Sequence, residues 1–225
     1  MNRPEVLLIE DILIELRDLN KSLESILSSL YNFSNLIQSP DLFDFTKKEI
    51  EGYNISDVEP DYRIINADLK IDVIDGTIKE YGLTLPKELL DFPFIGNLSI
   101  VYIKEGIRSI ENNTNVAFFL ENEYIRTNID PIFLPHILPT FNKIYNKQVP
   151  LESINAYLKF SRYNLYKIVT TLRSRLLQFT MEMKNTFGPI IEINSFVKNQ
   201  ENNNNTIREI IEATIDSYGL GPIRI

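Results

Sequence analysis

The spacing of apolar residues changes along this chain, and the change constrains its fold more than any other feature. Over the first 38 residues, apolar side chains recur at alternating steps of three and four, which is the period of an amphipathic helix. Between Pro60 and Pro86 the period falls to two, which is typical of a strand with one buried face. A chain that joins these two patterns is predicted to have an α+β fold.

The N-terminal pattern fits either one long coiled-coil helix or two antiparallel helices. The second arrangement has a break near residues 18–21, with Ser22 capping the next helix. We favour the break, because further leucine and isoleucine residues at positions 7–14 make the apolar face wider than a coiled-coil seam. A third helix is predicted to begin at Pro40 and to end at Gly52.

The central pattern predicts an antiparallel β-hairpin over residues 60–86. Residues 65–73 alternate between apolar and polar, and Asp75-Gly76 is a strong signal for the turn that returns the chain as a partner strand. A two-stranded hairpin needs more strands or a helix to cover it. Residues 116–120 and 154–160 are the candidates for additional strands in a small sheet.

The second half of the chain contains its clearest helix. Residues 161–187 carry apolar side chains at steps of three and four, and Gly188 ends the pattern, which predicts a long C-terminal packing helix. Two earlier segments are less regular. Residues 98–110 fit either a helix or a strand, and residues 130–139, with three prolines, are expected to be an ordered connector.

The C-terminal segment combines a polar run with an amphipathic pattern. Asn199–Asn205 contains no apolar residue and is expected to be a flexible linker or a long surface loop. Thr206 and Glu209 then have the spacing of a capping box, and an isoleucine stripe follows, which predicts a helix over Thr206–Tyr218. That stripe is expected either to dock on its own domain or to join another chain.

These elements predict one main domain and a tail. Residues 1–188 are expected to form a single α+β domain that contains a helical subunit at 5–52, the β-hairpin at 60–86 and the long helix at 161–187. Residues 189–225 are expected to form the linker and the amphipathic helix.

The composition excludes several kinds of chemistry. The 225 residues include no cysteine and one histidine, His136, so the chain has no thiolate nucleophile, no cysteine metal site and no two-histidine metal motif. The eight glycines do not form a phosphate-binding loop. No cofactor and no metal site are predicted, and His136 is interpreted as a surface or hydrogen-bonded structural residue.

The sequence also bears on location. No segment approaches the roughly 20 apolar residues needed to span a bilayer, and the N-terminal stretch contains acidic residues and no signal-peptide cleavage site. We therefore expect a cytoplasmic protein that does not enter a membrane.

One motif superficially resembles that of metal-dependent nucleases. Pro60-Asp61 is followed by Asp68 and Lys70, and such enzymes use two carboxylates that converge on a divalent ion beside a lysine. No turn signal separates the two aspartates here. On one continuous strand, positions seven apart point to opposite faces, so we interpret these side chains as solvated charges.

The net charge of −8 is unevenly distributed. Residues 159–184 contain six basic side chains and one acidic, whereas residues 1–60 contain twelve acidic and five basic side chains. Arg162 and Arg173 are expected to lie nearly on one line of the long helix. This strip either packs on the acidic N-terminal helices or binds phosphate groups; we favour packing, because the acidic remainder of the chain repels polyanions, and nucleic acid is not favoured as a partner.

The order of several short motifs resembles the AbiTii domain family over about residues 6–187. The resemblance is carried by Ile26-Leu27, Lys48-Glu49-Ile50-Glu51-Gly52-Tyr53, Pro60-Asp61-Tyr62-Arg63, Glu105-Gly106-Ile107, Ile110-Glu111 and Leu172-Arg173-Ser174-Arg175-Leu176-Leu177. The chain departs from the family at one position: members tend to have a tryptophan near the end of the third helix, where this chain has Phe45, which can also fill a core.

The resemblance implies a bacterial domain associated with phage defence and abortive infection, and it implies no agreed catalytic mechanism. The candidate site residues divide into Glu49, Arg63 and Glu105 as possible catalytic groups, and Tyr53, Tyr62, Arg162 and Arg173 as possible binding groups. A structural role competes for each of the matched positions. Gly52 can stop a helix, the tyrosines can wedge between helices and hairpin, and Arg63 can pair with Glu49 or Glu105. We favour these roles, because a buried ion pair explains the same residues.

Two classes of function follow. The preferred hypothesis is a non-enzymatic defence module that acts through protein contacts and oligomerises, either with itself or with a partner protein of a defence system. The alternative is a toxic effector enzyme, such as a metal-dependent nuclease that uses carboxylates with arginine or lysine. Convergence of Glu49, Arg63 and Glu105 in an open cleft favours the enzyme, and burial in one tight network favours the non-enzymatic module.

Overall fold

A computed structural model describes residues 6–90, 99–114 and 123–216 of the chain. The chain forms two compact units. The first, which we call the helical unit, comprises residues 1–63, 104–115 and 165–225. The second, the sheet unit, comprises residues 64–103 and 116–164.

The helical unit begins with three helices, as the sequence predicted. After a short strand, β1 (Val6–Leu8), come α1 (Ile9–Arg17), α2 (Leu23–Ile37) and α3 (Pro40–Glu51). The break between α1 and α2 is confirmed, and the Ser22 hydroxyl accepts a hydrogen bond from the Glu24 N–H at 3.1 Å. Capping of this kind satisfies a backbone donor that the first turn of a helix otherwise leaves without a partner.

The remaining elements of the helical unit come from three later segments. They are η1 (Asp61–Arg63), α4 (Ile107–Asn113), α7 (Tyr163–Phe187), β8 (Ile190–Glu192), α8 (Ile193–Val197), α9 (Gln200–Ile211) and a π-helical turn (Glu212–Asp216). Strand β8 pairs antiparallel with β1. Gly188 ends the long helix α7 as predicted, with a positive φ of 88° and its N–H bonded to the Lys184 carbonyl at 2.9 Å.

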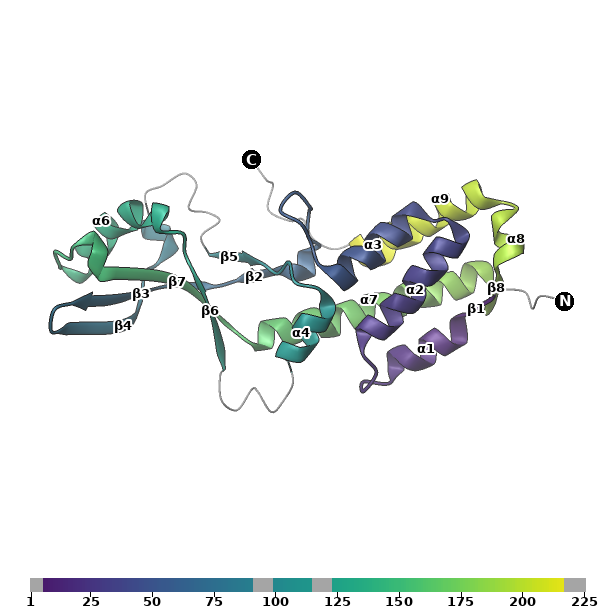
Figure 1. Ribbon diagram of the computed structural model, residues 1–225, viewed down its shortest axis with the longest axis horizontal. Helices are drawn as coiled ribbons and strands as arrows, with labels where there is room; N and C mark the ends of the chain where they lie inside the picture. The colour runs from purple at the N-terminus through teal and green to yellow at the C-terminus, as the bar shows by residue number, and fades with distance from the viewer. Residues whose placement is uncertain (1–5, 91–98, 115–122, 217–225) are drawn as a thin grey trace. The chain divides into compact units, whose positions relative to one another are not determined.

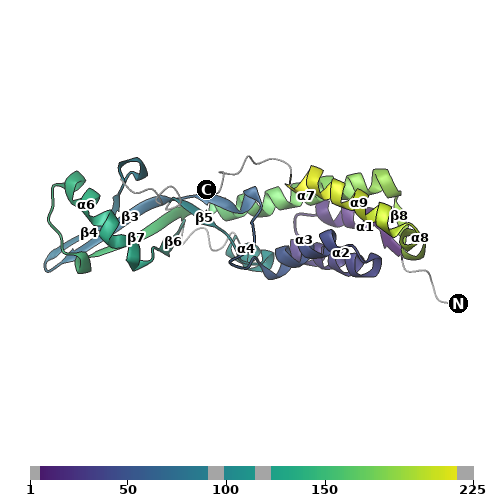
Figure 2. The ribbon, with the colours of Figure 1, turned by 90° about the horizontal axis from the view of Figure 1, so that it is seen from above.

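The apolar faces of these helices form one core. Helix α3 packs against both α2 and α9 (Figure 1), and α7 contributes to the same core. Figure 2 shows α9 next to α7. The most completely buried side chains of this core include Leu23, Ile26, Leu27, Ile37, Leu42, Ile107, Leu172, Leu176 and Ile207. The helical period read from the sequence therefore gives the buried face directly.

The prediction of a linker at Asn199–Asn205 is wrong. Helix α9 already begins at Gln200, so the asparagine run forms its first turns, and the predicted start at Thr206 is six residues late. Tertiary contacts override the low helix propensity of asparagine. The side-chain amide of Asn203 donates to the Phe196 carbonyl at 2.8 Å, and that of Asn204 donates to the Gln38 carbonyl at 3.0 Å.

The isoleucine stripe of the last helix docks on its own unit. Ile207, Ile210, Ile211 and Ile215 are buried in the helical core, and α9 packs against α3. Of the two fates considered for this stripe, the structure shows docking within the chain. The end predicted at Tyr218 lies outside the described residues.

The sheet unit contains the predicted hairpin within a larger sheet. Strands β3 (Asp68–Asp75), β4 (Ile78–Thr84), β6 (Tyr124–Asn128) and β7 (Ile154–Ser161) form an antiparallel sheet in the order β4-β3-β7-β6. A separate pair joins β2 (Ile64–Asn66) to β5 (Ile100–Tyr102). The candidate strand at 154–160 is confirmed as β7, whereas the candidate at 116–120 lies outside the described residues.

The proposed connector at residues 130–139 is wrong. This segment forms the short helix η4 (Pro131–Phe133) and most of α6 (Leu134–Tyr145). The Asp130 carboxylate accepts a hydrogen bond from the Ile132 N–H at 3.0 Å and caps the start. Pro131 and Pro135 occupy first-turn positions, where a missing N–H costs little, so two of the three prolines support a helix start.

Helix α6 covers one face of the four-stranded sheet (Figure 1). Its Ile137 and Phe141 are fully buried against apolar residues from β3 and β7, namely Leu69, Ile71, Val73, Ile154, Ala156 and Leu158. Three-residue helices at Lys87–Leu89 and Leu151–Ser153 are also described in this unit. The ambiguous segment at 98–110 contains both predicted alternatives in turn, strand β5 and the start of helix α4. The mixture of helices and small antiparallel sheets confirms the α+β class.

Candidate functional site

Two of the candidate catalytic residues form a buried ion pair in the helical unit. Glu49 lies near the end of α3 and Arg63 at the end of η1, and both side chains have an exposed fraction of 0%. The Arg63 Nη2 atom lies 2.7 Å from Glu49 Oε2, and Nε donates to Oε1 at 3.1 Å. This two-point geometry between guanidinium and carboxylate is the strongest form of the pair.

Both candidate tyrosines join the same carboxylate. The hydroxyls of Tyr53 and Tyr62 donate to Glu49 Oε1 at 2.6 and 2.8 Å. The Arg63 guanidinium also lies over the Tyr53 ring, at 4.9 Å from the ring centre. We call Glu49, Tyr53, Tyr62 and Arg63 the buried network. The two hydroxyls and the guanidinium all donate hydrogen bonds to the Glu49 carboxylate. These bonds stabilise its negative charge inside the protein.

Glu105 contributes its backbone and not its carboxylate. The Arg63 Nη1 atom donates to the Glu105 carbonyl oxygen at 2.7 Å, whereas the Glu105 side chain is exposed. Of the two partners considered for Arg63, the structure therefore shows an ion pair with Glu49 and a hydrogen bond to the main chain at Glu105.

The pKa directions in the network follow from its burial. Burial raises the pKa of both tyrosine hydroxyls, and the neighbouring Glu49 carboxylate raises it further. Burial lowers the pKa of Arg63, but the Glu49 carboxylate outweighs this effect, and the net direction is upward. The two phenols therefore stay neutral donors and the guanidinium stays charged, which suits a fixed hydrogen-bond network better than proton transfer.

Two glycines let the main chain pass close to the network. Gly52 follows α3 with a φ of +100° and forms an isolated antiparallel bridge to Glu105. A Cβ atom at Gly52 would lie 2.5 Å from the Lys104 carbonyl oxygen, and one at Gly106 would lie 2.2 Å from the Ile50 carbonyl oxygen. The predicted role of Gly52 as a helix stop is confirmed, and the structure adds this close crossing, which we call the glycine crossing.

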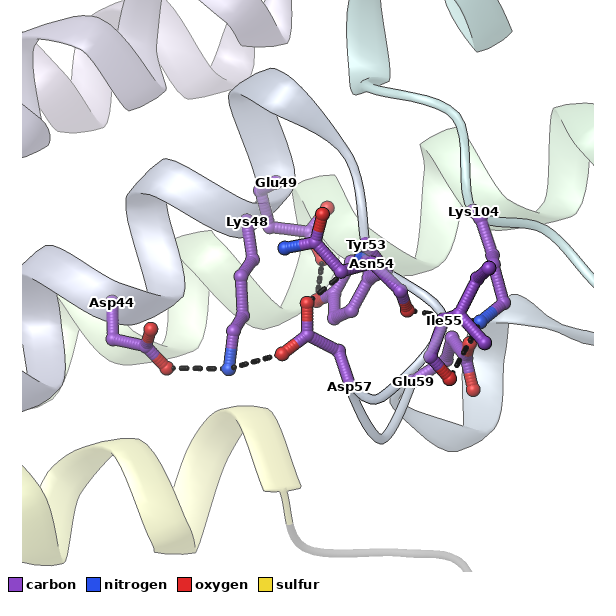
Figure 3. Close-up of polar contacts among 9 residues, drawn as sticks. All are labelled: Asp44, Lys48, Glu49, Tyr53, Asn54, Ile55, Asp57, Glu59 and Lys104. Atoms are coloured by element: carbon purple, nitrogen blue, oxygen red, sulfur yellow. Dashed lines mark hydrogen bonds and ion pairs between the residues drawn. The ribbon is translucent and has the colours of Figure 1, made fainter.

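A loop next to the network is held by lysine side chains. We call residues 54–59, which follow Tyr53, the 54–59 loop. Lys104 Nζ lies 2.9 Å from Glu59 Oε1 and donates to the carbonyl oxygens of Asn54 at 2.9 Å and Ile55 at 3.4 Å (Figure 3). Lys48 bridges Asp44, at 2.7 Å, and Asp57, at 3.3 Å (Figure 3).

The loop also closes on itself. The Asp57 carboxylate accepts a hydrogen bond from the Asn54 N–H at 2.7 Å, which lowers the pKa of Asp57, and Lys48 lowers it further. The Tyr53 N–H donates to the Lys104 carbonyl at 2.8 Å. Both ends of the loop are thus tied to the rest of the helical unit.

Comparison with known proteins shows which family this sequence matches. The model of the AbiTii family matches residues 7–209, which include the whole buried network. The chain belongs to the AbiTii family. Neither the comparison with curated proteins nor the comparison with solved structures found a match.

AbiTii membership gives the chain a context of abortive infection and phage defence. The match confirms the family resemblance and extends past residue 187 to residue 209. Among the helices that the structure describes, none combines the length and apolar character needed to cross a bilayer.

The basic residues of the long helix in this AbiTii chain serve packing contacts. Lys184 pairs with Glu10 of α1, and Arg175 Nη2 lies 2.8 Å from Asp61 Oδ1. Arg173 donates to carbonyl oxygens that follow the end of α1, at Asp18 (3.1 Å) and Lys21 (2.5 Å). Basic groups are favourable there because a helix ends in unsatisfied carbonyls.

Arg162 does not share a helical line with Arg173. Helix α7 begins at Tyr163, so Arg162 precedes it, and Arg162 belongs to the sheet unit. Its N–H donates to the Glu123 carbonyl at 2.9 Å, and its side chain is buried. The expected strip of two arginines on one helix is therefore wrong, because the helix starts later than the apolar pattern suggested.

The nuclease-like motif is separated between the two units of this AbiTii chain. Asp61 pairs with Arg175 in the helical unit, whereas Asp68 and Lys70 lie on β3 of the sheet unit, 3.8 Å apart. Within residues 6–90, 99–114 and 123–216, no group of three or more acidic or histidine side chains is placed to hold a metal ion. His136 is exposed on α6.

Sequence reasoning missed Lys104 and Glu59. Glu59 has a side chain with an exposed fraction of 2%, although nothing in its neighbourhood of the sequence distinguishes it from a surface acid. Its lysine partner is remote in sequence and is brought close by the glycine crossing. The small residues at Gly52 and Gly106 were the available signal for such a close approach.

Replacing Lys104 with methionine is expected to loosen the 54–59 loop. The change leaves the nearly fully buried Glu59 carboxylate without its ammonium partner. We expect a loss of about 1–3 kcal/mol in the free energy of unfolding. The loss is smaller than for a fully buried pair because Lys104 is partly exposed. Urea denaturation measures the loss, and limited proteolysis measures the faster cleavage within the loop.

Lys48→Met is the matched control. Its partner Asp44 is 62% exposed, and its partner Asp57, 17% exposed, keeps the hydrogen bond from the Asn54 N–H, so both effects should be smaller than for Lys104→Met. Equal effects of the two substitutions would contradict the role assigned to Lys104.

Proposed function

We propose that this AbiTii protein acts in phage defence as a non-catalytic module that works through contacts with another protein. The observation that carries the proposal is the burial of Glu49 and Arg63 in one closed network. A catalytic residue must touch its substrate, and side chains that are fully covered and fully hydrogen-bonded are better suited to holding a structure.

The 54–59 loop is the surface that we assign to the contact. The exposed fraction of Ile55 is 96% and that of Val58 is 71%, although Lys104 and Asp57 fix the backbone on which they stand. A loop held in one conformation loses less conformational entropy on binding than a free one. Two apolar side chains on such a loop are suited to insertion into a partner.

Acidic groups around the loop indicate the chemistry of that partner. Asp44 lies beside Lys48 with an exposed fraction of 62%, and Glu51 and Glu105 are exposed on the two segments that hold the loop. We infer a protein with an apolar pocket and a basic rim, because such a rim is complementary to these charges.

A second copy of the chain fits this loop less well. A twofold contact brings the same patch against itself, so the same acidic groups face one another. Oligomerisation therefore stays a prediction that needs a different surface. Light scattering on the purified chain measures it directly, and a mass of 26.2 kDa would contradict it.

The experiment that tests the proposal compares two exposed apolar sites of the helical unit. Ile55→Asp combined with Val58→Asp is expected to abolish protection of bacteria against phage, measured as plating efficiency, because it places charge in an apolar contact. Leu19→Asp, at a site with an exposed fraction of 80% between α1 and α2, should leave protection unchanged.

The same comparison addresses the enzyme alternative. If the protein is a toxic nuclease, the double substitution on the loop should leave host toxicity and protection intact. Full protection by a folded Ile55→Asp, Val58→Asp protein would therefore overturn the proposal. Neighbouring genes belong in the assay if the wild-type chain neither protects nor harms alone.

A further inference from the structure

The sheet unit carries a surface that the proposed function does not use. Helix α6 covers one face of the four-stranded sheet, and the residues between the buried positions of β3, β6 and β7 point to the other face. We call this the open face. Its side chains are basic, aromatic, amide and acidic groups: Asp68, Lys70, Asp72, Tyr124, Arg126, Asn128, Asn155, Tyr157 and Lys159.

The strand register places these groups next to each other. Lys159 of β7 lies opposite Arg126 of β6, and Tyr157 lies opposite Asn128. On the other side of β7, Tyr157 lies opposite Lys70 of β3. Side chains in directly opposed positions are about 5 Å apart at Cβ, so these groups lie next to one another. The Tyr157 ring, which is 2% exposed, lies beneath its neighbours.

Two cations lie on two aromatic rings in this surface. Lys159 Nζ lies 3.9 Å from the centre of the Tyr124 ring, and the Arg126 guanidinium lies 4.8 Å from the centre of the Tyr157 ring. The exposed fraction is 46% for Tyr124 and 60% for the Arg126 side chain. A phenol ring and a guanidinium plane are therefore both available to a planar ligand from outside.

A buried carboxylate fixes the centre of the open face. Asp72 accepts hydrogen bonds from the Gly82 N–H at 2.7 Å and from the Tyr157 hydroxyl at 3.1 Å. Burial raises the pKa of Tyr157, and the Asp72 carboxylate raises it further, so this hydroxyl stays a donor. Asp72 also lies 3.8 Å from the Arg126 guanidinium, and Asp68 lies 3.8 Å from Lys70 Nζ. The three cations Lys70, Arg126 and Lys159 outnumber these two aspartates.

We propose that the open face binds single-stranded RNA. The bases would stack on Tyr124 and on the plane of Arg126, and the cations Lys70, Arg126 and Lys159 would neutralise phosphates. Both contacts are the ones that proteins use for unpaired strands, whose bases are free to lie flat on a surface. The amides of Asn128 and Asn155, both exposed, can hydrogen-bond to the 2′-hydroxyls that distinguish RNA from DNA.

The proposal does not depend on the protein contact assigned to the 54–59 loop, because its residues all belong to the sheet unit. The charge of the open face also differs from that of the chain as a whole. The chain is acidic as a whole, at −8, but the open face combines three cations with two aspartates, of which Asp72 is buried. Local charge governs contact with a ligand when the distant charges are screened by salt.

The test measures binding of a short fluorescein-labelled RNA oligonucleotide of mixed sequence to the full chain, by fluorescence anisotropy. Binding is expected to weaken as salt is raised, because phosphate contacts release counterions. Tyr124→Ala is expected to weaken binding by about tenfold or more, because it removes the ring on which one base stacks. Lys159→Glu is expected to weaken binding by about the same factor, because it reverses a charge that contacts phosphate.

Lys143→Glu is the matched control. Lys143 is exposed on α6, the helix that covers the other face of the sheet, so this variant has the same net charge as Lys159→Glu. It should bind RNA within about twofold of the wild-type chain, since a non-contacting charge is screened. Circular dichroism checks that each variant is folded, and Lys159→Gln replaces Lys159→Glu if the latter is not.

Three results would overturn the proposal. The first is no binding of RNA by the wild-type chain at low salt. The second is equal weakening by Lys143→Glu and Lys159→Glu, which indicates non-specific attraction. The third is DNA of the same sequence, or duplex RNA, binding as tightly as single-stranded RNA.

Discussion

Arg63→Ala is expected to cost about 3–5 kcal/mol in the free energy of unfolding of the helical unit, because it leaves the Glu49 carboxylate buried without its counter-charge. The hydroxyls of Tyr53 and Tyr62 still donate to that carboxylate, but neither carries a positive charge. Loss of this size is a large part of the stability of a typical domain. Urea denaturation followed by circular dichroism measures it.

A double substitution controls for the loss of charge. Glu49→Leu with Arg63→Met replaces both partners with apolar side chains, and we expect it to recover a good part of the stability that Arg63→Ala loses, because no charge then stays buried alone. A loss below about 1 kcal/mol for Arg63→Ala would show that the pair is open to water and would restore Arg63 as a candidate for chemistry.

Gly106→Ala is expected to have the second large effect and to prevent normal folding of the helical unit. Its Cβ atom would lie 2.2 Å from the Ile50 carbonyl oxygen, and that atom belongs to the backbone of α3, which cannot move aside as a side chain can. The glycine crossing must therefore open, and the hydrogen bond from Arg63 to the Glu105 carbonyl must lengthen with it. Thermal unfolding and circular dichroism measure the outcome.

Gly188→Ala is the control for this prediction. Gly188 has a positive φ of 88°, but a Cβ atom there meets nothing within 4 Å. It should cost only about 1 kcal/mol, the usual penalty for a side chain in the left-handed region. Gly106 itself has an ordinary φ of −61°, so a loss at Gly106 no larger than the loss at Gly188 would mean that the crossing opens at little cost.

Where the apolar period was regular, the sequence was enough to predict the fold. The break before Ser22, the stop at Gly52, the hairpin at Asp75-Gly76 and the end of the long helix at Gly188 all lie where local signals placed them. The errors occurred where the local composition is unfavourable for a helix but the chain forms one. The prolines at 131–139 hid α6, although two of them occupy first-turn positions. The asparagines at 199–205 hid the start of α9, where a contact distant in sequence, from Asn204 to Gln38, supports the helix.

The sequence predicted only part of the candidate site, because contacts between distant segments decide the rest. The pairing of Glu49 with Arg63 was one of two alternatives, since a motif can suggest that two charged residues meet without fixing which atoms do so. The carbonyl of Glu105, the partnership of Lys104 with Glu59 and the aromatic–cation pairs of the open face all depend on strand register or on the close approach of backbones. Neither property can be read from one sequence.

The hydrogen bond between Arg63 and Glu105 also bears on how the chain folds. It joins positions 42 residues apart, so it closes a loop that contains β2 to β5. Closing a flexible loop of that length costs roughly 3 kcal/mol of chain entropy beyond a constant. The helices α1 to α3 can form from local contacts, but the network that completes them waits for this distant segment to return. We therefore expect a late, slow step in folding, in which a mainly helical unit behaves like a protein of high contact order.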